Sequence, residues 1–83
     1  MIKTFDKKLG EKLTAIRVER DLSQQYVADR MNLSRSAISY YELGRRTIDV
    51  ETLFKLCDIY NVDVNEILAD VRKYVYKNDK KRH

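Results

Sequence analysis

The chain has 83 residues and a formal net charge of +4 at pH 7, a size that allows one small domain. Its single cysteine excludes an intramolecular disulfide, so we expect a protein of the reducing cytoplasm. No apolar run approaches the ~20 residues of a membrane span, and the N-terminus has no apolar signal-peptide core. The absence of proline and the presence of only two glycines favour an all-α fold.

The charge changes sign along the chain. Residues 1–20 carry six basic and three acidic side chains, and residues 21–48 carry four basic and three acidic ones. Residues 49–70 carry one basic side chain against six acidic ones, whereas residues 71–83 carry six basic against one acidic. An acidic surface repels phosphate, so we expect the helices that follow Asp49 to face away from any nucleic acid.

The first predicted helix covers about residues 6–20. Asp6 is its expected N-cap, because a carboxylate there accepts from free N–H groups and suits the helix dipole. Gly10 costs about 1 kcal/mol relative to alanine inside a helix, so we expect another element to pack closely against it. The apolar face recurs at helical spacing and consists of Phe5, Leu9, Leu13 and Ile16.

Two short helices joined by a tight turn are predicted between Leu22 and Arg46. Ser23 and Ser34 are the expected N-caps, and Asn32 sits at the turn, where a left-handed backbone is needed. This arrangement is a helix-turn-helix, whose second helix enters the major groove of DNA. The side chains that should face inward are Val27, Ala28, Met31, Leu33, Ile38 and Tyr41.

A fourth helix is predicted to begin after the N-cap Asp49 and to end at Asn61. Asp63 and Glu66 then have the spacing of a capping box at the start of a short fifth helix. The apolar stripe of the fourth helix is expected to consist of Val50, Leu53, Leu56, Cys57 and Tyr60.

Residues 71–83 are predicted to form a basic C-terminal extension of a helix-turn-helix domain that covers residues 1–70. The apolar residues of this extension fit a continued helical face. The β-prone residues between Val71 and Lys77 also allow a strand, and periodicity cannot decide between the two over so short a run. The polar end, residues 78–83, is expected to fray.

Five sequence blocks between Leu9 and Leu68 have a recognisable pattern. They are Leu22-Ser23-Gln24, Ser34-Arg35-Ser36-Ala37-Ile38-Ser39, Glu42-Leu43-Gly44-Arg45-Arg46, Glu51-Thr52-Leu53 and Val62-Asp63-Val64-Asn65-Glu66-Ile67-Leu68. These blocks are similar to the phage repressor and Cro-like (XRE) family of helix-turn-helix regulators. Asn32 stands where the family usually has a turn glycine, and Ile48 replaces a common proline. The resemblance implies a compact, lambda-repressor-like bundle of about five short helices.

Four outward side chains of the second helix-turn-helix helix are candidates for reading bases. Arg35 is the strongest candidate, because one guanidinium can bond O6 and N7 of guanine together. Ser36 and Ser39 can form weaker and less selective hydrogen bonds, and Tyr40 can touch a thymine methyl or bond a phosphate. The alternative for Arg35 is a solvated surface charge.

Phosphate contacts are expected from other positions, because they fix the register of a protein on DNA without reading sequence. Gln24 lies at a helix N-terminus, which favours a phosphate, and Ser34 is a further candidate. The resemblance implies that Gln24 also braces the recognition helix, and that Arg45, Arg46 and Thr47 lie along the sugar-phosphate edge. A solubilising charge pair beside a turn is the alternative for the two arginines.

The resemblance also implies a partly buried ion pair between Arg17 and Glu42. Such a pair would tie the first helix to the end of the recognition helix. We expect its role to be structural, since the loss of one partner would strand a buried charge.

Nothing in the sequence indicates an enzyme, a metal site or a cofactor. His83 is the only histidine and lies at the C-terminus, so no ordered Ser-His or Cys-His arrangement is available. Cys57 falls on an apolar stripe, where a core thiol is expected. The acidic residues lack the spacing of metal ligands, and neither a glycine-rich phosphate loop nor a small-molecule site is indicated.

The sequence therefore predicts a sequence-specific regulator, a repressor, that binds a palindromic operator in double-stranded DNA as a homodimer. One recognition helix reads few base pairs, so specificity usually needs two half-sites about 34 Å apart. The alternatives are a protein-interaction module, such as an antitoxin or a partner-binding adaptor, and an RNA binder that uses the basic tail. The candidate dimer residues, which could instead close the core of one chain, are Ile67, Leu68, Val71, Tyr74 and Val75.

Overall fold

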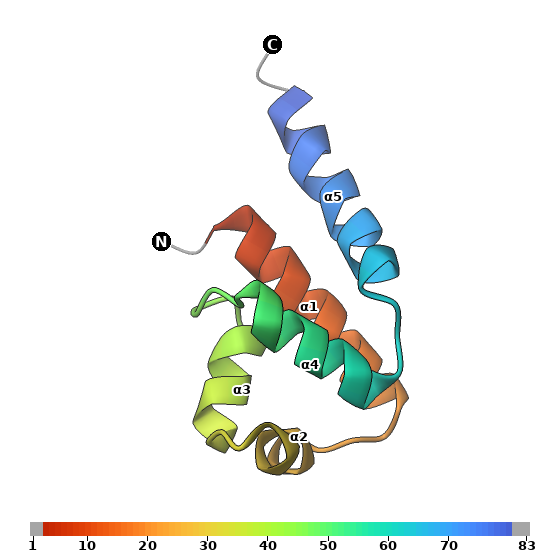
Figure 1. Ribbon diagram of the computed structural model, residues 1–83. Helices are drawn as coiled ribbons and strands as arrows, with labels where there is room; N and C mark the ends of the chain where they lie inside the picture. The colour runs from red at the N-terminus through yellow and green to blue at the C-terminus, as the bar shows by residue number, and fades with distance from the viewer. Residues whose placement is uncertain (1–2, 81–83) are drawn as a thin grey trace.

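The computed structural model describes residues 3–80, and the side chains of residues 3–75. This part of the chain forms five helices and no strand, which confirms the predicted all-α bundle (Figure 1). The helices are α1 (Thr4–Glu19), α2 (Gln24–Met31), α3 (Arg35–Glu42), α4 (Val50–Tyr60) and α5 (Val64–Lys80).

Local side-chain chemistry sets several of the helix boundaries. Ser23, Ser34 and Asp49 are the N-caps of α2, α3 and α4. The side-chain oxygen of each accepts a hydrogen bond from the backbone N–H of the residue three positions later in the chain. Asn32 and Asn61 end α2 and α4 in the left-handed region, with φ of 59° and 55°. Asparagine tolerates this region because its short side chain bonds locally. The predicted caps and both asparagine stops of these helices are confirmed.

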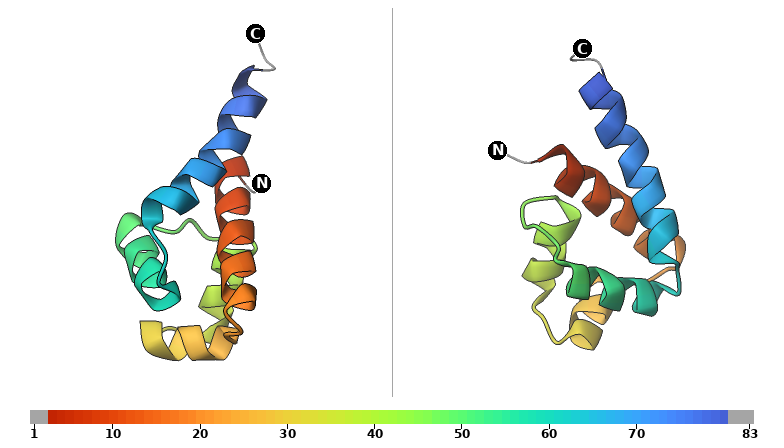
Figure 2. Two further views of the ribbon diagram at one scale, coloured as in Figure 1. Left: turned by 90° about the vertical axis from the view of Figure 1, so that its right-hand side faces the viewer. Right: turned by 45° about the horizontal axis from the view of Figure 1, so that its top comes forward.

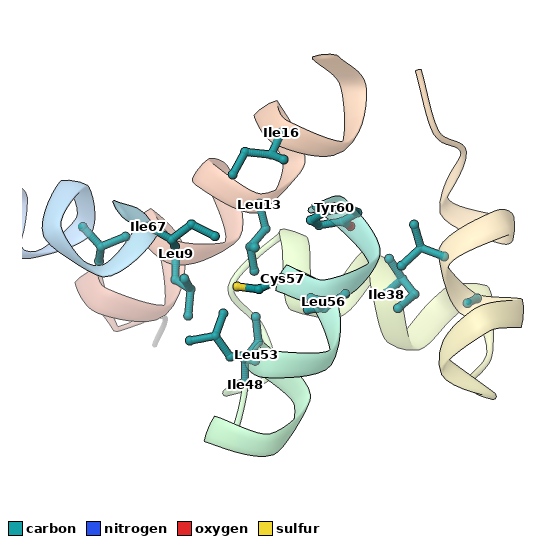
Figure 3. Close-up of a cluster of buried hydrophobic side chains, with 13 residues drawn as sticks. Leu9, Leu13, Ile16, Ile38, Ile48, Leu53, Leu56, Cys57, Tyr60 and Ile67 are labelled. Atoms are coloured by element: carbon teal, nitrogen blue, oxygen red, sulfur yellow. The ribbon is translucent and has the colours of Figure 1, made fainter. Parts of the chain in front are cut away.

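The helix α1 lies at the centre of the packing, with contacts to α3 on one side and α5 on the other, while α4 packs against α2 and α5 (Figures 1 and 2). The side chains of these helices meet in one continuous core (Figure 3). The largest of its fully buried side chains are Tyr60, Leu9, Leu13, Ile38, Ile67, Val27 and Val71.

Asp6 is not the N-cap of α1, contrary to the prediction. The helix begins two residues earlier, at Thr4, and its N-cap Lys3 makes no side-chain capping bond. Asp6 instead lies inside the first turn, is 8% exposed, and accepts a hydrogen bond from Thr47. A partner 41 positions away therefore fixes this carboxylate in place of the local N–H groups.

Three of the apolar residues expected to face inward are exposed instead. Phe5 is 41% exposed, Leu33 37% and Val50 66%. Phe5 and Val50 lie in the first turns of α1 and α4, and Leu33 lies in the turn between α2 and α3. These positions are at the edges of the bundle, where neighbouring helices no longer cover a side chain.

The described part of the C-terminal extension, residues 71–80, is helical, so the strand alternative was wrong. The helix α5 has 17 residues and is longer than the short fifth helix that was predicted. It runs through the expected boundary at residue 70, and its inner face is held by Ile67 and Val71, each 1% exposed. The backbone of residues 78–80 belongs to α5, and the remainder of the segment expected to fray, residues 81–83, lies outside the described residues.

Candidate DNA-binding site

One face of α3 carries polar side chains while the opposite face is buried. Arg35, Ser36 and Tyr40 are exposed and Ser39 is half-buried, whereas Ile38 is 1% exposed. The helical period brings positions i, i+1, i+4 and i+5 to one side, so the four predicted base-reading residues share a surface. Hydroxyl and guanidinium groups on an exposed helix face are chemically suited to hydrogen bonds with base edges.

Gln24 connects both ends of α3 to the start of α2. Its amide Nε2 donates to Glu42 Oε1 at 2.9 Å, and its Oε1 accepts from Arg35 Nη1 at 3.2 Å. Arg35 is the first residue of α3 and Glu42 is the last. The amide therefore bonds to side chains at both ends of α3 and holds the guanidinium of Arg35 at the N-terminal end.

Glu42 and Arg17 form the ion pair that anchors this network. Arg17 Nε lies 2.6 Å from Glu42 Oε2, and a second guanidinium nitrogen lies 3.2 Å from Oε1. The third nitrogen donates to the backbone carbonyl of Leu22 at 2.6 Å. The hydrogen bond to Glu42 raises the pKa of Arg17 above its usual value. All three guanidinium nitrogens thus have partners, which a buried charge requires.

The loop that follows α3 presents two arginines. Arg45 and Arg46 are exposed, and the Arg46 guanidinium lies 5.8 Å from the ring centre of Tyr41. Thr47 is also exposed as a residue, but its hydroxyl donates to Asp6 Oδ2 at 3.0 Å. The loop thus offers two cations to solvent, and its only hydroxyl is bonded within the chain.

Two of the five candidate dimer residues are not available to a second chain. Ile67 and Val71 are each 1% exposed because they pack into the core beneath α5. The prediction that Ile67 and Val71 contact a second chain is therefore wrong. Both residues close the core of their own chain, which was the alternative. Leu68 and Tyr74 remain 37% and 53% exposed, and Val75 is half-buried.

Two long-range contacts that hold the site's framework could not be predicted from the sequence. One is the bond from Thr47 to Asp6; in the other, the side chain of Arg20 donates to the carbonyl of Tyr60 at the end of α4. These pairs are 41 and 40 positions apart, so no local pattern marks them.

Two shallow pockets, of about 210 and 390 Å³, open between α1 and α5. Both are lined by cationic side chains and carboxylates, and neither is lined by a residue of α3. Within the described residues, no group of three or more potential metal ligands comes together. No helix in this same part of the chain is long and apolar enough to cross a membrane.

The chain is similar to several bacterial and phage regulators. It is 36% identical over 61 residues to the cryptic phage CTXphi transcriptional repressor RstR of Vibrio cholerae, covering 74% of this chain and 55% of that protein. It is 32% identical over 74 residues to the uncharacterized HTH-type transcriptional regulator YqaE of Bacillus subtilis, covering 88% of this chain and 64% of that protein. The chain thus spans 55% and 64% of the length of these two relatives.

A solved structure and a family comparison agree with this similarity. The S. venezulae BldD DNA-binding domain superposes with a TM-score of 0.70 at 34% identity, covering 78% of this chain and 97% of that one. Residues 13–67 match the model of a family described as helix-turn-helix. The two relatives are named as transcriptional regulators, and the solved structure is that of a DNA-binding domain. With two thirds of its length inside the match, the chain belongs to the helix-turn-helix family of XRE-type DNA-binding domains.

Proposed function

We propose that this chain is a transcriptional repressor that binds double-stranded DNA in a sequence-specific manner, with α3 in the major groove. The observation that carries the proposal is the hydrogen-bonded chain from Glu42 through Gln24 to Arg35. A base-reading side chain needs a fixed starting position, and this network supplies one on an exposed helix face. Similarity to a phage repressor supports repression as the outcome of binding.

The polar face of α3 would read bases. Arg35 is placed to bond guanine, and Ser36, Ser39 and Tyr40 would add weaker contacts from the same surface. This assignment rests on their shared position on one face of α3, where Arg35, Ser36 and Tyr40 are exposed and Ser39 is half-buried.

Two groups of residues would bind the DNA backbone. The N-termini of α2 and α3, at Gln24 and Ser34, present N–H groups that favour phosphate. Arg45 and Arg46 would lie along the neighbouring sugar-phosphate edge, where their exposed charges neutralise phosphates. Thr47 would flank the same edge, although its hydroxyl proton is already donated to Asp6.

We further propose that the protein binds a palindromic site as a homodimer. The exposed residues Leu68 and Tyr74 lie on α5, whose C-terminal end is remote from α2 and α3 (Figure 1). Self-association there would leave both recognition helices free. The acidic residues of α5 lie mainly in its first half and the basic ones in its second half, so two copies in antiparallel arrangement would be complementary in charge.

Selection of bound sites from a pool of random duplexes tests the DNA-binding proposal. We expect one half-site sequence to emerge, repeated with two-fold symmetry about one helical turn apart. Affinity should fall steeply with salt while the preference over random duplex persists. A module that binds only a protein partner would enrich no sequence, and that result would refute the proposal.

Analytical ultracentrifugation tests the dimer separately. We expect the protein to be bound to the selected duplex as two copies. Replacement of Leu68 and Tyr74 by polar residues should reduce this to one copy, because the proposed contact between the chains is lost. The variant should still fold, because neither side chain belongs to the core. A wild-type chain that remains a monomer on its selected duplex would refute the homodimer and leave base reading by α3 intact.

A further inference from the structure

The loop between α3 and α4, residues 43–49, is attached to the first turn of α1 at two points. The first point is Gly44, whose φ of +75° suits glycine. A Cβ built on Gly44 would lie 2.7 Å from the Cα of Lys7 and 2.9 Å from its backbone nitrogen. The two backbones are therefore in direct contact, with no room for a side chain between them.

The second point is the hydrogen bond from Thr47 to Asp6. Thr47 Oγ1 lies 3.0 Å from Asp6 Oδ2, and Asp6 is 8% exposed although it is ionisable. A threonine hydroxyl has one proton, and here that proton is donated to the carboxylate. The hydroxyl can therefore no longer donate to a phosphate, and the carboxylate gains a partner that its burial requires.

Arg45 and Arg46 lie between these two attachment points. Both are exposed, whereas the residue that follows Thr47, Ile48, is buried at 9% exposure. The pair thus projects from a short span whose two ends are held on consecutive residues of α1, Asp6 and Lys7. Without the second attachment, the segment that carries the arginines would be held on its C-terminal side only by the burial of Ile48.

We infer that Asp6 is a positioning residue for DNA binding, which acts by holding Thr47 and thereby the arginine pair in place. This inference rests on the proposed function and deepens it. Thr47 then serves as an internal attachment point of the loop, and its side chain is not a phosphate ligand. Asp6 does this from a helix that contributes no base-reading residue.

The direction of the effect distinguishes this role from simple electrostatics. A carboxylate near a DNA-binding surface repels phosphate, so removal of its charge alone would strengthen binding. Loss of the attachment would weaken binding. The arginines would then be mobile in the free protein, and ordering them in the complex would cost free energy. Asp6→Asn removes the charge but keeps an oxygen that accepts from Thr47, whereas Asp6→Ala removes both.

The test compares these variants on a duplex selected from a random pool and on a shuffled duplex, at one salt concentration. Asp6→Ala and Thr47→Val should each weaken binding to both duplexes roughly three- to tenfold, the range of one hydrogen bond. The double variant should be no weaker than either single variant, because both remove the same bond. Asp6→Asn and Thr47→Ser should stay within about twofold of wild type or, for Asp6→Asn, bind more tightly.

Asp58→Ala is the matched control, since it removes an exposed carboxylate of α4 and changes the net charge equally. Urea denaturation of every variant establishes that the protein is folded under the binding conditions. Equal affinities of Asp6→Ala and Asp58→Ala would overturn the inference, and so would tighter binding by Asp6→Ala.

A readout without DNA separates the inference from the proposed function. Backbone ¹⁵N relaxation should show increased motion of residues 44–48 in Asp6→Ala but not in Asp58→Ala. If the wild-type protein fails to bind any duplex while this increase is seen, the attachment stands and the DNA-binding proposal falls. If the loop keeps the wild-type mobility, the attachment by Asp6 is refuted.

Discussion

Arg17 and Glu42 are 25 positions apart, yet the guanidinium of one meets the carboxylate of the other through two hydrogen bonds of 2.6 and 3.2 Å. Their side chains are only 13% and 7% exposed. Glu42 also accepts from Gln24 on α2, so one carboxylate joins three helices. The geometry of the recognition surface therefore depends on a charge that lies beneath it.

Replacing Glu42 by alanine should destabilise the protein by about 3–5 kcal/mol, because the guanidinium of Arg17 would remain buried without its partner. The free energy of unfolding, measured by urea denaturation, checks this value. Asp70→Ala is the control, since the Lys12–Asp70 pair has an N···O distance of 2.6 Å but side chains 36% and 43% exposed. The Asp70→Ala variant should lose far less unfolding free energy than Glu42→Ala. Similar losses for the two variants would contradict a buried, structural pair.

The two arginine sites should differ in how they affect DNA binding. Arg35→Ala should remove about 1–3 kcal/mol of discrimination at one base pair of each half-site and leave binding to random duplex nearly unchanged. Arg46→Ala should weaken binding to all duplexes alike. It should also reduce the slope of the logarithm of the affinity against the logarithm of the salt concentration by about one. Titrations of the selected and the shuffled duplex at several salt concentrations measure both effects. Equal losses on the two duplexes for Arg35→Ala would exclude a base contact.

Gly10 allows α1 to approach the end of α3. A Cβ at this position would clash with the backbone carbonyl oxygens of Glu42 and Tyr41. Helix propensity alone predicts that Gly10→Ala gains about 1 kcal/mol. The clash with two backbone atoms predicts the opposite, a loss of about 1–3 kcal/mol, because α1 must move away from α3.

Thermal denaturation decides whether Gly10→Ala stabilises or destabilises the protein. The control is Ala15→Gly in the same helix, where the side chain is exposed and only helix propensity should count. We expect a lower Tm for both variants. A higher Tm for Gly10→Ala would show that the contact between the two helices relaxes without cost.

The sequence predicted those parts of the fold that depend on neighbouring residues. Ser23, Ser34 and Asp49 cap their helices by accepting a hydrogen bond from the backbone N–H three residues later. Asn32 and Asn61 adopt the left-handed backbone conformation that ends a helix. Each is a property of a short segment. The face of α3 follows in the same way from its period of 3.6 residues.

Other features depend on which segments meet in space, and the sequence could not predict them. Asp6 has the local chemistry of an N-cap, yet its partner Thr47 is brought to it by the packing of the α3–α4 loop on α1. Val71 fits a strand or a helix by local preference. Its burial against the core, at 1% exposure, is a property of the packed bundle. Tertiary packing thus decides what local preference leaves open.

Two exposed carboxylates should make the fold sensitive to acid. Hydrogen bonds from Thr52 lower the pKa of Asp49 below its ordinary value of 3.8, and the hydrogen bond from Lys12 lowers that of Asp70. The folded protein then holds fewer protons at these sites than the unfolded chain does. Their stabilising contribution is complete above the unfolded pKa and is lost as the pH falls below 3.8 through the lower folded pKa values.

Urea denaturation across the acid range measures this dependence. Asparagine is as good an N-cap as aspartate and does not titrate, so Asp49→Asn should keep the α4 cap at neutral pH. The variant with both Asp49→Asn and Asp70→Asn should therefore lose less unfolding free energy than wild type between pH 5 and pH 2, the range in which paired carboxylates take up protons. An unchanged slope against pH would mean that these two carboxylates have the same proton affinity in the folded and unfolded chains, and that other groups cause the acid sensitivity.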